Sequence, residues 1–172
     1  MTPIIILALT IIGALIHLFI SKQPRTSRRV VEVFLLYFLV IAFGLGSLFG
    51  AFGHIFYADQ VAKDIGWPAG SPFQFEVGAA NLGIGIAGIL CIWFRRGFWA
   101  STAITAGTFY FLDGIGHIRE TQAGDHAAYN AGATLYVDFI IPIVTWGLLL
   151  AYHRITGRAF VVESEDIALV RV

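Results

Sequence analysis

The stretch GHIFYADQVAKDIGWPAGSPFQFEVGAAN, residues 53–81, separates two of the long apolar runs that make up most of this chain. His54 ends the run before it, and Gln74, Glu76 and Asn81 lie at the start of the run that follows. A carboxylate at the start of a membrane-depth helix is costly unless it is paired, neutral or coordinating an ion. The stretch therefore predicts an ordered loop, residues 58–72, between two membrane helices, with a polar site close to it.

The composition is that of a membrane protein. Hydrophobic residues make up 58% of the 172 residues and charged residues 13%, against roughly 25% charged residues in soluble proteins. Five apolar runs are each near the ~20 residues that a helix needs to cross a bilayer. These runs cover residues 3–20, 30–57, 73–94, 98–118 and 132–152. We predict an all-α bundle of five transmembrane helices within residues 1–157, followed by a cytoplasmic tail, residues 158–172.

Basic residues predict the orientation of these helices. Of the 11 Lys and Arg residues, all but Lys63 and Arg119 follow the first run, follow the third run or lie near the C-terminus. Cytoplasmic loops of membrane proteins carry an excess of Lys and Arg. We therefore place the N-terminus outside and the C-terminus inside, in a multi-pass protein of the cell membrane. The first run has no basic segment before it and no small-residue cleavage site after it, so we expect it to be retained.

In this orientation, titratable side chains from four helices reach the outer half of the membrane. They are His54, Glu76, Asp113, His117 and Asp138, accompanied by the neutral side chains of Gln74, Asn81 and Asn130. Asp113 and His117 are four residues apart, so they share one face of a helix. Pro142 follows Asp138 at the same spacing and removes the backbone N–H that would bind the Asp138 carbonyl. The sequence thus predicts that polar groups converge at one depth.

Imidazole and carboxylate groups of this kind suit Zn²⁺ or Fe. We predict a divalent-metal site with His54, His117, Glu76, Asp113 and Asp138 as its candidate ligands. In a metal-dependent hydrolase or oxidoreductase, Glu76, Asp113 and Asp138 would be the catalytic candidates, two of them as ligands and the third as general base. The other predicted occupant is a small amphipathic or lipid-like ligand. Its candidate binding residues are Trp67, Gln74, Asn81 and Asn130.

Other interpretations stay open at this stage. In one of them the polar residues form pairs, such as His54 with Glu76, that set the helix register, because buried polar groups need partners whatever their function. A proton- or ion-coupled transporter needs a polar path across the membrane, and the inner half offers hydroxyls such as Ser101 and Thr105 but no mid-depth carboxylate. A third class is a non-catalytic accessory subunit of a membrane complex. A homo-oligomer is compatible with all three, and we predict no nucleic-acid partner.

Small residues predict how the second run packs. Gly46 and Gly50 precede His54 on one stripe of the helix. Such a small-xxx-small pair lets another helix approach closely. We therefore expect Gly50 to lie in a close contact and to tolerate a large side chain less well than Gly44 or Ser47, which we place on the opposite side.

Four segments resemble the pattern of a family of small, uncharacterised multi-pass membrane proteins of bacteria and archaea. The segments are GWPAGSPFQFE at residues 66–76, AANLG at 79–83, DGIGHI at 113–118, and residues 130–132. The resemblance covers residues 54–142 and implies a membrane fold without an assigned reaction. It also implies that Trp67, Ser71, Gln74, Glu76, Asn81, His117 and Asn130 belong to the shared pattern of the family.

Overall fold

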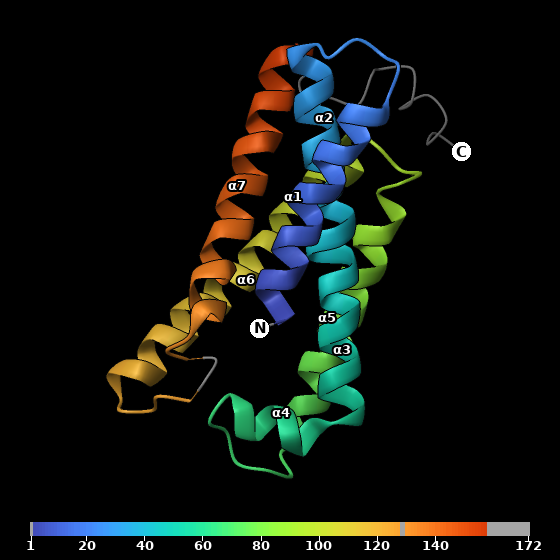
Figure 1. The fold of residues 1–172 in the computed structure, drawn as a ribbon. Helices are drawn as coiled ribbons and strands as arrows, with labels where there is room; N and C mark the ends of the chain where they lie inside the picture. The colour runs from blue at the N-terminus through green and yellow to red at the C-terminus, as the bar shows by residue number, and fades with distance from the viewer. Residues whose placement is uncertain (1, 128–129, 158–172) are drawn as a thin grey trace, which may run out of the picture.

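The computed structural model describes residues 2–127 and 130–157, and every regular element within them is a helix (Figure 1). The elements are α1 (Thr2–Ile20), α2 (Ser27–Tyr37), the π-helical segment η1 (Phe38–Leu45), α3 (Gly46–Phe56), α4 (Ala58–Asp64), α5 (Phe73–Leu90), α6 (Gly97–Gln122) and α7 (Ala133–Thr156). Helices α2, η1 and α3 form one continuous helix of 30 residues. The predicted all-α class is confirmed for this part of the chain. The predicted tail, residues 158–172, lies outside the described residues.

Four of the described helices are long and apolar enough to cross a membrane. They are Pro3–Ile20, Ser27–Phe56, Phe73–Leu90 and Ala133–Thr156. Each coincides with a predicted span to within a few residues. Helix α6 has 26 residues, but it is not among the four, and its second half carries Asp113, His117, Arg119 and Glu120. The fifth predicted span therefore exists as a helix, and its place in the membrane stays a prediction.

The predicted ordered loop contains the short helix α4 and two glycine turns. Gly66 and Gly70 adopt φ angles of 80° and 78°, a region that side-chain-bearing residues rarely occupy. The carboxylate of Asp59 on α4 accepts a hydrogen bond from the Gly70 N–H at 2.9 Å. Helix α4 and the turns thereby hold the loop against the end of α3.

The helices pack mainly in two pairs, α3 against α5 and α6 against α7. Helix α2 contacts α7 and α1, which joins the two pairs at the end of the bundle opposite α4 (Figure 1). The larger of two apolar clusters in the described residues lies between the long second helix and the α6–α7 pair. Its largest buried members are Leu35, Phe38, Leu39, Phe43 and Trp99. The indole N–H of Trp99 donates to the Cys91 carbonyl at 2.8 Å, which ties the start of α6 to the end of α5.

The closest helix approach lies on a different stripe from the one we predicted. A Cβ added to Gly88 of α5 would lie 2.5 Å from the Gly44 Cα atom. Ser47 is fully buried and shares a 2.9 Å hydrogen bond with the Tyr110 hydroxyl. The expected tolerance of Gly44 and Ser47 is therefore wrong, because α5 and α6 contact this helix from two sides. Gly50 does face α5, where an added Cβ would lie 3.3 Å from Asn81 Oδ1.

Helix α1 contacts the rest of the bundle along a narrow stripe. Ala14 and Leu18 are buried together with Val33 of α2. Large apolar side chains cover the rest of its surface and are exposed over its full length. They include Ile5, Leu9, Ile12, Leu15, Ile16, Phe19 and Ile20. An exposed apolar surface of this extent is typical of an interaction site or a membrane contact.

Candidate metal centre

Three titratable side chains meet where α6 packs on α7. His117 Nε2 lies 4.0 Å from Asp113 Oδ2 on the same helix and 3.7 Å from Asp138 Oδ2 on α7. One ligand atom from each residue falls within 4.8 Å of the others. The side chain of Asp113 is 55% exposed, whereas that of Asp138 is only 6% exposed. It therefore has one buried end and one accessible end.

The imidazole of His117 is oriented by a chain of hydrogen bonds from the outer loops. His117 Nδ1 lies 2.7 Å from Asn130 Oδ1, and Asn130 Nδ2 donates to the Ile65 carbonyl at 3.2 Å. Because the Asn130 amide nitrogen already has an acceptor, its oxygen faces the ring, and Nδ1 must be the protonated nitrogen. Thr121 also donates to the Asn130 carbonyl at 2.7 Å. His117 Nε2 is thus the ring nitrogen that faces the two aspartates, as in metal sites where an outer group orients the imidazole.

The carboxylate of Asp138 is buried and incompletely satisfied. Its Oδ2 atom has no hydrogen-bond partner among the described residues. Leaving a buried acceptor unpaired costs about 1–3 kcal/mol, and more for a charged group. Pro142 lies inside α7 four residues later, so it also provides no N–H for the Asp138 carbonyl. The Oδ2 atom therefore needs a further partner, which the helix itself does not supply.

Gly114 brings the two helices close enough for this contact. A Cβ added at Gly114 would lie 2.9 Å from the Phe139 ring and 3.3 Å from the Asp138 Cβ. Because both distances are tighter than almost all real contacts, a larger residue would push α7 away from α6. The glycine between Asp113 and His117 is thus required by the packing that delivers Asp138 to them.

His54 belongs to the other helix pair and has a similar amide partner. His54 Nδ1 lies 2.6 Å from Gln74 Oε1 on α5. Gln74 is 1% exposed, and its amide nitrogen has no hydrogen-bond partner among the described residues. His54 also lies close enough to Asp113 for the two to interact electrostatically. It therefore borders the group from the α3–α5 side.

The remaining predicted site residues lie outside the three-residue group. Glu76 is exposed on α5, two residues from Gln74 and hence on roughly the opposite face of the helix. The amide of Asn81 is buried and donates to the Val77 carbonyl of its own helix at 3.1 Å. Trp67 is half-buried and packs on Phe73, with 5.8 Å between ring centroids. The structure thus brings Asp113, His117, Asp138, Asn130, His54 and Gln74 to one region and leaves Glu76, Asn81 and Trp67 apart from it.

Sequence reasoning overlooked two neighbours of the group. Tyr110 precedes Asp113 by three residues and interacts electrostatically with both aspartates, while its hydroxyl bonds to Ser47 of α3. Thr121 follows His117 by four residues and donates to its carbonyl at 3.0 Å. The spacing of residues 110, 113, 117 and 121 places all four side chains on one face of α6. This spacing, which is visible in the sequence, could have identified Tyr110 and Thr121 as neighbours of the site.

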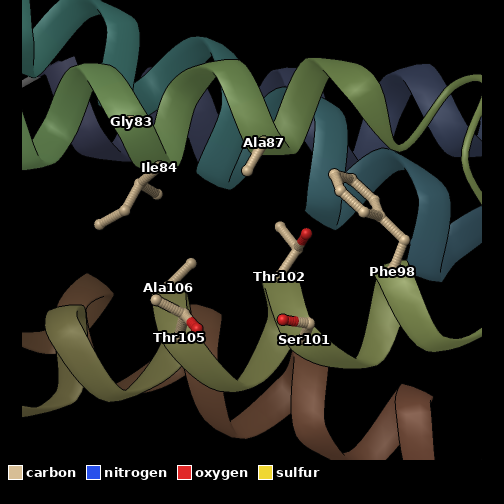
Figure 2. Close-up of a pocket in the computed structure, with 8 residues that line it drawn as sticks. All are labelled: Gly83, Ile84, Ala87, Phe98, Ser101, Thr102, Thr105 and Ala106. Carbon is tan, nitrogen blue, oxygen red and sulfur yellow. The ribbon is translucent and has the colours of Figure 1, made fainter.

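A separate groove runs between α5 and α6 (Figure 2). Its volume is about 160 Å³. The lining residues are Gly83, Ile84, Ala87, Phe98, Ser101, Thr102, Thr105 and Ala106. Figure 2 shows the three hydroxyl side chains on the α6 side, facing the apolar residues of α5. Among the described residues no titratable side chain lines it. It ends about two helical turns before Asp113, so we treat it as distinct from the metal centre.

Two carboxylates and one imidazole form a donor set that Zn²⁺ and Fe²⁺ both accept. Comparison with curated proteins and comparison with solved structures give no match. A profile described as a family of unknown function matches residues 1–158. That description agrees with the predicted family without an assigned reaction, whereas its occurrence in bacteria and archaea stays a prediction. The chain belongs to the family of unknown function DUF6790.

Proposed function

We propose that this chain is an integral membrane protein that binds a divalent metal ion through Asp113, His117 and Asp138. The observation that carries the proposal is the buried Asp138 Oδ2, which has no hydrogen-bond partner in the described part of the chain and lies 3.7 Å from a histidine nitrogen. Buried charges are stabilised when they are paired or coordinate a metal. A cation between these residues would supply the partner that the helices do not.

The spacing of the donor atoms supports this assignment. Two donors bound at ~2.1 Å to a tetrahedral ion lie about 3.4 Å from each other. The His117–Asp138 and His117–Asp113 separations of 3.7 and 4.0 Å need to contract by only a few tenths of an ångström. Side-chain rotation of the exposed Asp113 can provide most of that movement, while the imidazole is already oriented by Asn130.

Three protein donors leave coordination positions for water or a substrate, as catalytic metal sites do. Asp113, which is largely exposed, is the donor that an entering ligand would meet first. Exchange of Asp113 between coordination and general-base catalysis would suit metal-assisted hydrolysis. With iron in place of zinc, the same open positions suit oxidation. A small amphipathic or lipid-like molecule is the ligand class that this membrane setting favours.

Metal analysis of the purified full-length protein tests the proposal. We expect about one equivalent of zinc or iron in the wild type by mass spectrometry, and loss of most of it in Asp138→Asn. Glu76→Gln is the matched control, because it neutralises an exposed carboxylate of α5 outside the group. Wild-type protein that binds no divalent metal, even after incubation with Zn²⁺ or Fe²⁺, would contradict the proposal. Equal loss in both variants would also contradict it.

The proposed topology has five membrane spans, with α6 as the fourth of them, the N-terminus outside and the C-terminus inside. Its support is the distribution of Lys and Arg, which places the loop between α1 and α2 in the cytoplasm. In a Cys91→Ser background, we expect a membrane-impermeant thiol reagent to label cysteines at positions 64 and 125 in intact cells. Cysteines at positions 27 and 163 should react only after the cells are opened. Labelling of position 27 in intact cells would contradict this orientation.

A transporter and an accessory subunit remain the alternatives of other classes. The hydroxyl groups of the α5–α6 groove add polarity to the predicted inner half (Figure 2). A proton path needs titratable side chains, and the groove lining contains none. Metal binding therefore accounts for more of the observed polar groups than transport does.

A further inference from the structure

A second polar cavity lies at the other end of the bundle, where the loop after α1 enters α2. Its volume is about 280 Å³, and its lining comprises Gln23, Pro24, Thr26, Arg28, Arg29 and Glu32. Thr26 caps α2 by accepting the Arg29 backbone N–H at 3.3 Å. Helix N-termini carry a partial positive charge, and the first turn of α2 adds two arginines and no acidic residue. Positive charge thus accumulates at one point.

The guanidinium of Arg29 is held in place by side chains other than carboxylates. It donates to Ser21 Oγ at 2.7 Å and to Gln23 Oε1, and it lies 3.5 Å from His17 Nε2. Its Nε atom is buried and has no hydrogen-bond partner among the described residues. A buried, unpaired donor on a charged group is costly. The arrangement orients the side chain without neutralising it.

The lining of this cavity also contains one acidic residue, Glu32, whose charge pairs with a third arginine. The carboxylate of Glu32 lies at ion-pair distance from Arg95, at 3.8 Å. Neither Arg28 nor Arg29 has an acidic partner within that range among the described residues. The cavity therefore has two arginines without a paired carboxylate, and phosphate is an anion that arginine binds well.

Exposed apolar side chains lie at the end of α1, a few residues before those that line this cavity. The loop joins two candidate membrane spans, Pro3–Ile20 and Ser27–Phe56, so it lies at the membrane surface if those spans insert. Phe19 and Ile20 are 78% and 72% exposed at the end of α1. The Arg25 guanidinium packs over the Phe19 ring at 5.4 Å. A ligand that contacts both surfaces needs an anionic group and an apolar part, and a phospholipid combines the two.

We propose that Arg28 and Arg29 bind the phosphate of an anionic phospholipid headgroup, whose acyl chains lie along α1 beside Phe19 and Ile20. This inference rests on the membrane location proposed above and is independent of the metal. Juxtamembrane arginines attract anionic lipids of the cytoplasmic leaflet. The cavity adds a defined position for one headgroup to that general attraction.

Thermal unfolding of the full-length protein in neutral detergent tests this site. We expect phosphatidylglycerol to raise the unfolding temperature more than phosphatidylcholine does. The Arg28→Gln/Arg29→Gln double variant should lose this difference, with lipid affinity about tenfold or more weaker. Arg29→Lys keeps the charge but lacks the fork and the Nε donor, so it should retain only part of the response. It also gives a second measurement if the double variant folds poorly.

Two controls remove a positive charge elsewhere: Arg96→Gln on the turn before α6 and Lys63→Gln on α4. Both should keep the wild-type response to phosphatidylglycerol. Equal stabilisation by the two lipids, or a full response in the double variant, would overturn the proposal. An equal shift with inorganic phosphate alone would overturn the lipid as ligand. The last outcome concerns the chain's own acidic residues as the anion at this site. If the wild type shows no preference for phosphatidylglycerol and only the Glu163→Gln/Glu165→Gln/Asp166→Asn variant does, the proposal is overturned.

The metal measurement separates this inference from the proposed function. The arginine variants should retain wild-type metal content, and Asp138→Asn should retain the wild-type lipid response. Failure of either proposal therefore leaves the other testable.

Discussion

In each helix pair a histidine ring is held by the side-chain amide of a neighbouring element. His117 of α6 has Asn130 at 2.7 Å, and His54 of α3 has Gln74 at 2.6 Å. The Asn130 amide nitrogen is itself bound to the Ile65 carbonyl, whereas the Gln74 amide nitrogen has no partner among the described residues. The tautomer of His117 therefore follows from the structure, and that of His54 does not.

The surroundings of the two rings differ in charge as well. Carboxylates lie 3.7 and 4.0 Å from His117 Nε2, and among the described residues none lies at ion-pair distance from His54. His117 and His54 thus have similar amide partners, although only His117 is a candidate metal ligand and His54 serves helix packing. A histidine becomes a candidate ligand here through the acidic residues that a second helix delivers.

The largest expected effect separates the two histidines directly. His117→Gln removes the only nitrogen donor of the proposed three-residue set, so we expect metal affinity to fall at least a hundredfold. His54→Gln should lower it by less than tenfold, because among the described residues no carboxylate lies at ion-pair distance from His54, which interacts with Asp113 from further away. Competition with a chromophoric chelator measures both affinities in detergent. An equally large loss in His54→Gln would make His54 a fourth ligand and abolish the contrast.

Substitution of the two amide partners should also affect metal affinity unequally, with the larger loss on the His117 side. Asn130→Ala releases the His117 ring, and loss of an outer partner of this kind typically weakens metal binding 10–100-fold. Gln74→Ala should change metal affinity by less than threefold while destabilising the fold, since Gln74 is buried between α3 and α5. Chelator competition and thermal unfolding give the two readouts. A larger metal effect from Gln74→Ala would contradict the assignment.

The smallest expected effect concerns the glycines that bring each pair together. Gly114→Ala and Gly78→Ala should each cost about 1–3 kcal/mol in unfolding free energy, as overpacking usually does. An added Cβ would lie 3.3 Å from Asp138 Cβ in the first and 3.2 Å from His54 Cβ in the second. Only Gly114→Ala should also weaken metal binding, because it moves Asp138 away from His117. Gly116→Ala is the control, since nothing lies within 4 Å of its added Cβ.

Local periodicity was sufficient for several of these features. The apolar runs marked every long helix, and the four-residue spacing of Asp113 and His117 placed both on one face of α6. The same rule separates Gln74 from Glu76, because residues two apart on a helix lie roughly 200° apart. Buried positions of α5 recur at residues 74, 78, 81, 85 and 88. These positions hold glycines and amide side chains, so the sequence already indicates this face of the helix. Position 76 does not belong to it.

The sequence by itself determined the all-α class, the apolar helices and the side chains that could bind a metal. These follow from composition and from contacts within one helix, which depend only on neighbouring residues. Only the tertiary structure decided that Asp138 meets His117, that Asn130 sets the ring, and that His54 pairs with Gln74 in place of Glu76. Those contacts depend on the rotation of each helix about its axis, and packing at sites such as Gly114 and Gly88 sets that rotation.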